Sequence, residues 1–160
     1  MQAKSTYSLA QIALHWAIAA LVIANYFISE GMGDALDARL EGGPAPDGPT
    51  ATFHVYAGVA VLVLALIRLA IRLRTGAPES SGTGLMGKAA TLMHWALYAL
   101  MIGVPALGAV TWFGGIDATG DLHALAANGM MAMALVHAGA ALFHHYILKD
   151  GLLTRMLRTN

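Results

Sequence analysis

Four long apolar stretches constrain the fold of this chain more than any other feature. Each is about 20 residues or longer, which at about 1.5 Å per helical residue is enough to cross a hydrocarbon layer of about 30 Å. A soluble bundle would carry a charged face on every helix, whereas only 11% of the 160 residues are charged and 58% are hydrophobic. We therefore predict an all-α, integral membrane four-helix bundle that forms one domain over residues 1–160. The stretches are about Leu9–Ser29, Ala51–Leu73, Leu85–Phe113 and Leu122–Leu148.

The charged residues are sorted between the two sides that four spans would create. The chain ends and the middle loop would share one side, and that side holds eight of the nine basic residues: Lys4, Arg68, Arg72, Arg74, Lys88, Lys149, Arg155 and Arg158. The other side holds Arg39 and seven acids: Glu30, Asp34, Asp37, Glu41, Asp47, Asp117 and Asp121. Because loops rich in Lys and Arg stay in the cytoplasm, we expect both termini to be cytoplasmic.

The segments between the apolar stretches read as loops. Glu30–Thr50 is acidic and rich in Gly and Pro, so we expect it to be irregular and external. Thr75–Thr83 is polar and would form a short cytoplasmic loop, and Gly114–Asp121 would form a tight external turn. These three connections would join the four spans.

A weak internal repeat relates the two halves of the chain. Leu14–Ile23 reads LHWAIAALVI and Met93–Ile102 reads MHWALYALMI. The stretch that follows each of them opens with a bulky apolar residue and a histidine, at His54 and His123. We interpret the repeat as two helical hairpins related by an axis along the membrane normal.

Four histidines lie inside the apolar stretches at two depths. His123 and His137 are fourteen residues apart, so on a helix they face the same way and differ in height by about 21 Å. His54 begins its stretch at the outer level, and His15 lies near the inner level. The pairs His54/His123 and His15/His137 are therefore matched in depth.

Imidazoles in hydrocarbon are costly without a partner. Single buried histidines commonly form hydrogen bonds between helices, but four at two matched depths favour axial ligation of two b-type haems, with iron held between two imidazoles. Zinc is disfavoured, because neither depth offers the three or four close ligands that a zinc site needs. The chain has no cysteine, so covalent haem attachment, iron–sulfur clusters and thiol catalysis are excluded.

His94 offers an alternative at the inner level. It mirrors His15 in the repeat, so symmetry alone would favour a His15/His94 pair over His15/His137. The residues themselves do not decide between His94 and His137.

Further polar residues cluster near the inner level. Arg68 and Arg72 are one helical turn apart and would extend to the cytoplasmic headgroups, pair with the propionates of the inner haem, or do both. His144 and His145 lie near the inner end of the last stretch and could bind a quinone carbonyl or a haem propionate. Solvation at the membrane interface is the alternative for both histidines.

These residues resemble the bacterial cytochrome b561 family, which is similar to the membrane b subunits of hydrogenases and formate dehydrogenases. The resemblance covers nearly the whole chain, and the run from Val136 to Tyr146 and the His123–His137 spacing are its most specific parts. The residues that carry it are Ile12-x-x-His15-Trp16, the His54 helix with Arg68-Leu69-x-x-Arg72-Leu73, Gly87 through His94, and Val136-His137-A-x-A-A-L-x-His144-His145-Tyr146.

The resemblance implies a multi-pass cytochrome of the bacterial inner membrane with two b haems. It implies His54 with His123 for the outer haem and His15 with His137 for the inner one, leaving His94 as a non-ligand. The family moves electrons between quinones and a second redox partner. One branch is similar to superoxide oxidase, in which superoxide reduces the outer haem and ubiquinone is the acceptor.

One feature departs from that branch. Superoxide is an anion, and a site that collects it should present positive potential, whereas the outer loops carry seven acids and one arginine. We expect a superoxide:ubiquinone oxidoreductase, with a quinol-linked subunit or shuttle serving a periplasmic redox protein as the alternative, and a haem sensor without turnover as a third. The expected partners are the lipid bilayer, a quinone, and either superoxide or that redox protein. No nucleic-acid partner is expected.

Overall fold

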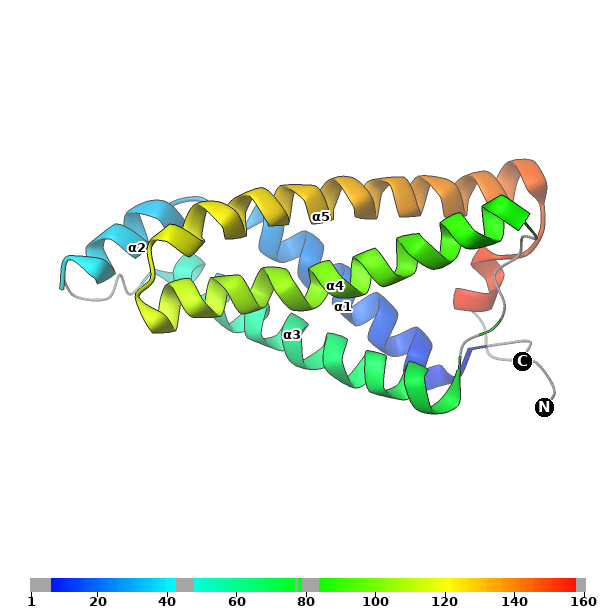
Figure 1. The fold of residues 1–160 in the computed structure, drawn as a ribbon, viewed down its shortest axis with the longest axis horizontal. Coiled ribbons are helices and arrows are strands. Elements are labelled where there is room, and N and C mark those ends of the chain that lie inside the picture. Colours follow the sequence, from blue (N-terminus) through cyan, green and yellow to red (C-terminus); the bar gives the residue numbers. More distant parts are fainter. Residues whose placement is uncertain (1–6, 43–47, 77, 79–83, 158–160) are drawn as a thin grey trace.

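The computed structural model describes residues 7–42, 48–76, 78 and 84–157. Within them the chain forms five α-helices and two short helical turns (Figure 1). The elements are α1 (Leu9–Phe27), α2 (Met32–Leu40), α3 (Pro49–Thr75), α4 (Gly84–Gly114), α5 (Ala118–Phe143), the π-helical turn η1 (His144–Leu148) and the 3₁₀ turn η2 (Leu153–Met156).

Four helices are long and apolar enough to cross a membrane. They are α1, α3, α4, and α5 continued through η1 to Leu148. Their ends lie within a few residues of the four predicted stretches, and most of their surface faces outward rather than into the protein. The predicted all-α membrane bundle is confirmed, and the chain is a multi-pass membrane protein.

Local sequence explains where these helices begin and end. Ser8 caps α1: its Oγ accepts a hydrogen bond from the Gln11 N–H at 3.3 Å, and the Gln11 side chain accepts one from the Ser8 N–H at 3.0 Å. Pro49 opens α3, where its missing N–H costs nothing. Gly76 ends α3 with a φ of 74°, a conformation that glycine adopts without strain.

The helices pair as two hairpins, α1 with α3 and α4 with α5, and α3 packs against α4. A small core lies where α1, α3 and α4 meet, built on Ile18, Val61 and the fully buried Ala65. Ala65 is small enough to let the helix backbones approach closely, as small residues do between membrane helices. Contact between α1 and α5 is slight, so the bundle is open along that seam.

The external loop is only partly irregular. The sequence predicted no helix in Glu30–Thr50, but Met32–Leu40 forms α2 and α3 already begins at Pro49, so that prediction is wrong for eleven residues. The run of Gly and Pro that suggested a loop lies at residues 42–49, after α2. Asp34 in its first turn and Arg39 in its last complement the helix dipole. The other external turn is also shorter than predicted, because α4 reaches Gly114 and α5 begins at Ala118.

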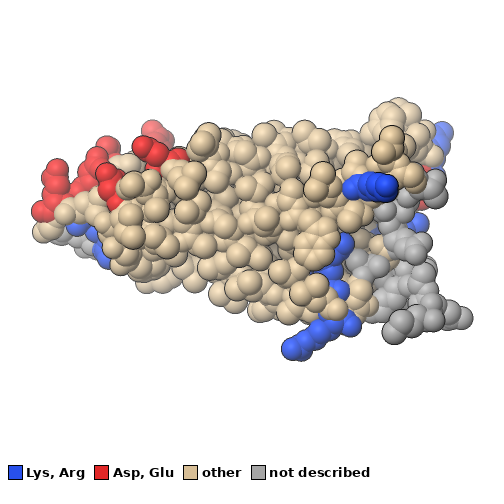
Figure 2. All heavy atoms as spheres, in the orientation of Figure 1, with Lys and Arg blue, Asp and Glu red and all other residues tan. Residues whose placement is uncertain are grey.

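The charges separate along the bundle. Acidic side chains gather around α2 and the start of α5, whereas Lys and Arg gather mainly at the opposite end (Figure 2). The start of α1 and the end of η2 both lie at this basic end, as four spans require (Figure 1). The basic end is called the inner end below and the acidic end the outer end. Which of them faces the cytoplasm stays a prediction.

Candidate functional site

Two histidines from different helices meet near the outer end. The ring centres of His54 on α3 and His123 on α5 are 6.0 Å apart, and the rings are nearly perpendicular at 82°. The Nδ1–H of His123 donates to the Val104 carbonyl of α4 at 2.8 Å. This bond leaves the Nε2 lone pair of His123 available to a metal, as backbone carbonyls commonly do for ligating histidines.

The position of the His123 ring depends on Gly108. A Cβ at this position of α4 would lie 3.0 Å from Cε1 and 3.1 Å from Nδ1 of the imidazole. These distances are too short for ordinary packing, so only glycine lets the ring lie against the helix.

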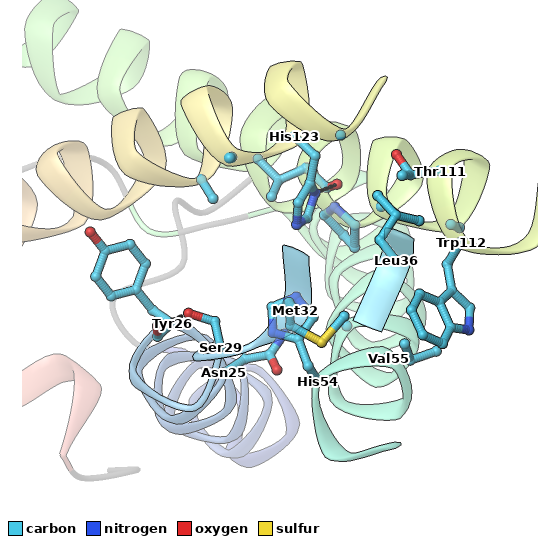
Figure 3. Close-up of a pocket in the computed structure, with 18 of the residues that line it drawn as sticks. Asn25, Tyr26, Ser29, Met32, Leu36, His54, Val55, Thr111, Trp112 and His123 are labelled. Atoms are coloured by element: carbon cyan, nitrogen blue, oxygen red, sulfur yellow. Dashed lines mark hydrogen bonds between the residues drawn. The ribbon is translucent and has the colours of Figure 1, made fainter. Parts of the chain in front are cut away.

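A cavity of about 650 Å³ surrounds these two rings. It is lined by all four spanning helices, and α2 covers it through Met32, Leu36 and Asp37 (Figure 3). Ligand cavities in proteins measure about 300–1,000 Å³, so the space suits a cofactor rather than a water molecule.

Two polar atoms at this cavity are buried without a hydrogen-bond partner among the described residues. They are the Oδ1 of Asn25 and the Nδ1 of His54. Buried polar groups are nearly always satisfied in native structures. Their presence beside a large cavity indicates that another group belongs there.

Three histidines meet near the inner end. The ring of His137 on α5 lies 6.4 Å from that of His15 on α1, at an interplanar angle of 71°. It also lies 5.3 Å from that of His94 on α4, at 74°. The Nδ1 of His94 is 2.7 Å from the Ala90 carbonyl. In the described part of the chain, no three His, Asp or Glu side chains converge closely enough to hold a metal ion by themselves.

The two pairs, His54/His123 and His15/His137, fit axial ligation of a flat cofactor. A metal–imidazole bond is about 2 Å long, so two imidazoles on opposite sides of one iron have ring centres about 6 Å apart. The measured 6.0 Å and 6.4 Å match this spacing. The orphaned Nδ1 of His54 and the cavity around it add to the fit at the outer level.

The two predicted arginines lie at the inner level but face different helices. Arg68 donates from a guanidinium nitrogen to the Gln11 carbonyl of α1. Arg72 lies over the rings of Trp95 and Tyr98 on α4, at 5.8 Å and 5.7 Å from their centres. Neither pairs with a carboxylate of the described residues, so both guanidiniums retain hydrogen-bonding capacity for an anionic group.

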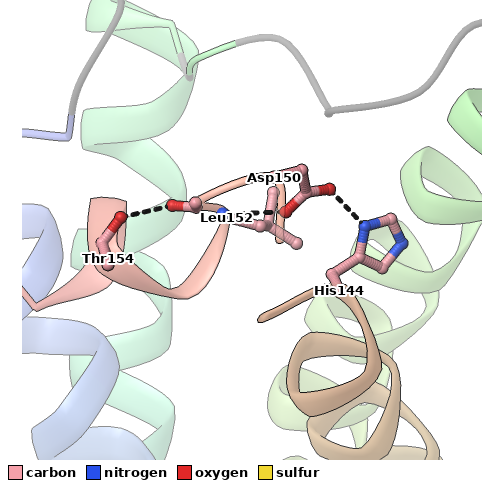
Figure 4. Close-up of polar contacts among 5 residues, drawn as sticks. His144, Asp150, Leu152 and Thr154 are labelled. Carbon is pink, nitrogen blue, oxygen red and sulfur yellow. Dashed lines mark hydrogen bonds and ion pairs between the residues drawn. The ribbon is translucent and has the colours of Figure 1, made fainter. Parts of the chain in front are cut away.

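The two histidines at the end of α5 have partners within the protein. The Nδ1–H of His144 donates to Asp150 at 2.5 Å, and the other Asp150 oxygen accepts from the Leu152 N–H at 3.0 Å (Figure 4). His145 packs against Tyr146, with ring centres 4.8 Å apart. These contacts fold the chain back after the π-helical turn, and the Met156 carbonyl accepts a hydrogen bond from Trp16 at 2.8 Å.

Asp150 is the acid that holds this segment. Burial raises the pKa of its carboxyl group, but the hydrogen bonds from His144 and Leu152 and the nearby charges of His144 and Arg155 outweigh burial and lower the pKa below its usual value. Asp150 therefore stays ionised at neutral pH.

The outer end is anionic around the cavity. Asp37, Asp117 and Asp121 contribute to its walls. Arg39 is engaged with α4: its Nε donates to the Trp112 carbonyl at 2.9 Å, and its guanidinium lies 5.0 Å from the centre of the Trp112 ring. This contact holds α2 over the cavity.

Comparison with known proteins assigns the family. The sequence profile of prokaryotic cytochrome b561 matches residues 6–159. The chain belongs to this family. It is 47% identical over 158 residues to cytochrome b562 of Cereibacter sphaeroides, covering 99% of both chains. It is 33% identical over 175 aligned positions to the probable superoxide oxidase CybB of Yersinia pestis, covering 94% of this chain and 95% of that protein. It is 32% identical over 179 aligned positions to cytochrome b561 homolog 1 of Escherichia coli K12. This alignment covers 94% of this chain and 96% of that protein.

Membership of the cytochrome b561 family implies a b-type haem and a role in membrane electron transfer. The resemblance expected from the histidine pattern is therefore confirmed at the level of the family. The paired imidazoles and the cavity are what such a cofactor requires of the protein.

Sequence reasoning missed three contributors to the outer site of this cytochrome: Gly108, the Val104 carbonyl and α2. Gly108 carried a weak signal, because a glycine three residues after Pro105 in an apolar stretch is unfavourable in a helix unless packing requires it. A backbone carbonyl gives no sequence signal.

Proposed function

We propose that this cytochrome b561 family member binds two b-type haems and passes electrons across the membrane between an outside donor and the quinone pool. The observation that carries the proposal is the pair of imidazoles near each end of the bundle, with ring centres 6.0 Å and 6.4 Å apart. Helix α5 supplies one histidine to each pair, and His123 and His137 are separated along it by about 21 Å.

The proposal assigns His54 and His123 to the outer haem and His15 and His137 to the inner haem. The haem iron, when bound, accepts and releases one electron at a time. Val104 and Gly108 hold the His123 ring in place. Arg68 and Arg72 are assigned to the propionates of the inner haem, because a guanidinium pairs well with a carboxylate.

For the acceptor we propose ubiquinone, bound at the inner end. His144 and His145 lie there with Lys149, on half-buried or exposed turns beside the end of α5. The Nδ1 of His144 is already bonded to Asp150, so its Nε2 is the atom available to a quinone oxygen.

For the donor we propose superoxide, because the chain is 33% identical to a probable superoxide oxidase over nearly its whole length. In this reaction superoxide loses one electron and becomes dioxygen, and two such electrons with two protons convert ubiquinone to ubiquinol. The residues 1–160 would then act as one domain in the bacterial inner membrane, with both termini in the cytoplasm.

The acidic outer end favours a second kind of redox partner, a cationic protein that exchanges electrons with the quinone pool through this chain. Three carboxylates contribute to the walls of the outer cavity, whereas Arg39 of α2 is engaged with Trp112. Such a field repels an anion and attracts a positively charged partner. The chain would then be a quinol-linked subunit or shuttle.

Stopped-flow mixing of the purified oxidised protein with superoxide, or with ubiquinol in its place, distinguishes these two alternatives. Haem absorbance is followed with and without ubiquinone at two salt concentrations. Rapid reduction that ubiquinone reverses is the result expected for the oxidase, and the acidic field predicts that added salt raises the rate. Reduction by ubiquinol but not by superoxide would support the subunit or shuttle, and no response to either would contradict both.

A further inference from the structure

The inner level holds one imidazole more than two axial positions require. At the outer level His54 and His123 face each other alone among the described histidines, at 6.0 Å. At the inner level His137 is in ring contact with both His15 and His94, at 6.4 Å and 5.3 Å. His137 is therefore common to two candidate pairs.

His94 is oriented in the same way as the outer histidine His123. Each directs Nδ1 at a backbone carbonyl of α4: His94 at Ala90, 2.7 Å away, and His123 at Val104, 2.8 Å away. With Nδ1–H donating, the lone pair lies on Nε2, the form in which an imidazole binds a metal. Within the described residues His15 and His137 make no such bond.

The three inner rings do not form one three-ligand metal site, and a flat haem leaves its iron only two axial positions. They can therefore serve only as alternative pairs. His15/His137 already matches the spacing of about 6 Å expected from metal–imidazole bonds of about 2 Å. His94 and His137 at 5.3 Å would have to part by roughly 1 Å, so this pair is the second choice.

Each alternative also has a cation beside it. Arg68 is bonded to the Gln11 carbonyl, one helical turn before His15 on α1. Arg72 lies over the rings of Trp95 and Tyr98, which follow His94 within about one turn of α4. A haem held by either pair would find a guanidinium for its propionates.

Resting on the proposed function, we infer that His94 is a reserve axial ligand of the inner haem. It shares His137 with His15 and replaces His15 when that imidazole is absent or displaced. The outer haem has no such reserve among the described residues. The two levels should therefore respond differently to loss of a ligand.

The test compares H15A, H94A, the double variant H15A/H94A and the matched outer variant H54A, each purified as the full chain. Haem per chain is measured as the pyridine haemochrome, and ligation is read from the electron paramagnetic resonance spectrum. We expect two haems in H15A, with the inner one still low-spin but shifted in its g values, and two in H94A. We expect one haem in the double variant and one in H54A.

The inference would be overturned if H15A lost its inner haem as completely as H54A loses its outer haem. That result would leave the proposed ligation intact. Two unchanged haems in H54A would instead contradict the proposed ligation itself. Retention of the outer haem in the inner-level variants, and of the inner haem in H54A, shows that each variant has folded. If H15A does not accumulate, H15Q keeps most of the side-chain volume and is judged by the same outcomes.

Discussion

At position 108 the absence of a side chain decides where an imidazole can lie. A Cβ there would meet the His123 ring at 3.0 Å, so Gly108→Val should push the ring away from its place opposite His54. Displacing a group that supports a metal ligand commonly costs ten-fold or more in affinity. We expect the outer haem to bind about ten-fold more weakly and the inner haem to remain, as measured by haem titration of the apoprotein.

Gly103→Val is the matched control for this prediction. Gly103 lies on the same helix, and a Cβ there would meet nothing within 4 Å. Equal loss of the outer haem from both variants would mean that the helix itself, and not the ring contact, is disturbed.

Some residues of the candidate site could be predicted from the sequence and others could not. Histidines stand out in apolar stretches because a polar ring there needs a partner, and their spacing gives two depths. The sequence left open whether His15 pairs with His94 or with His137, and the structure brings His137 into ring contact with both His15 and His94. The carbonyls that orient His94 and His123 belong to Ala90 and Val104, whose side chains carry no such information.

At the scale of the elements, α2 is tied to α4 through the side chain of Arg39. Arg39 donates to the Trp112 carbonyl and lies over its ring. A cation–π contact and a hydrogen bond at an exposed site are together worth roughly 1 kcal/mol. Arg39→Ala should therefore speed amide hydrogen exchange within α2 by about five-fold, measured by mass spectrometry.

Arg74 is an exposed arginine at the opposite end of the bundle. The control variant Arg74→Ala should leave amide exchange in α2 unchanged. Unchanged exchange in Arg39→Ala as well would show that α2 is held by its apolar contacts rather than by Arg39.

The elements could be predicted wherever length and hydropathy were sufficient. The four spans follow from apolar stretches that must satisfy their own backbone in lipid. Helix α2 could not be predicted in this way, because its nine residues mix charged and apolar side chains and precede a segment rich in Gly and Pro. In the structure it is placed by tertiary contacts, among them that of Arg39 with Trp112 of α4, which local composition does not reveal.

The segment after α5 should respond to acid. The pKa of Asp150 is lower in the folded protein than in the unfolded chain. Its contacts therefore stabilise the folded state fully at a pH above the usual carboxyl pKa of about 4. This contribution is lost as the pH falls through the lower pKa of the folded state. Wild type should be more stable than Asp150→Asn at pH 7, and the difference in Tm should vanish at sufficiently low pH. A difference that stays constant with pH would contradict the role given to the carboxylate.

At the scale of the whole molecule, the sorted charges predict which end faces the cytoplasm. The chain has no cysteine, so single introduced cysteines report sidedness cleanly. Asp34 at the acidic end and Thr75 at the basic end are both exposed. In spheroplasts a membrane-impermeant maleimide should label Asp34→Cys at once and Thr75→Cys only after lysis. The reverse pattern would mean that the orientation is inverted.

The central claim is that two pairs of imidazoles, near opposite ends of one helical bundle, hold two b haems. The most direct test is the ratio of haem to protein in the purified wild type, measured as the pyridine haemochrome against amino-acid analysis, with the spin state read from the same sample. The account predicts two b haems per chain, both low-spin. One haem per chain in fully loaded protein, or a high-spin haem with a vacant axial position, would contradict it.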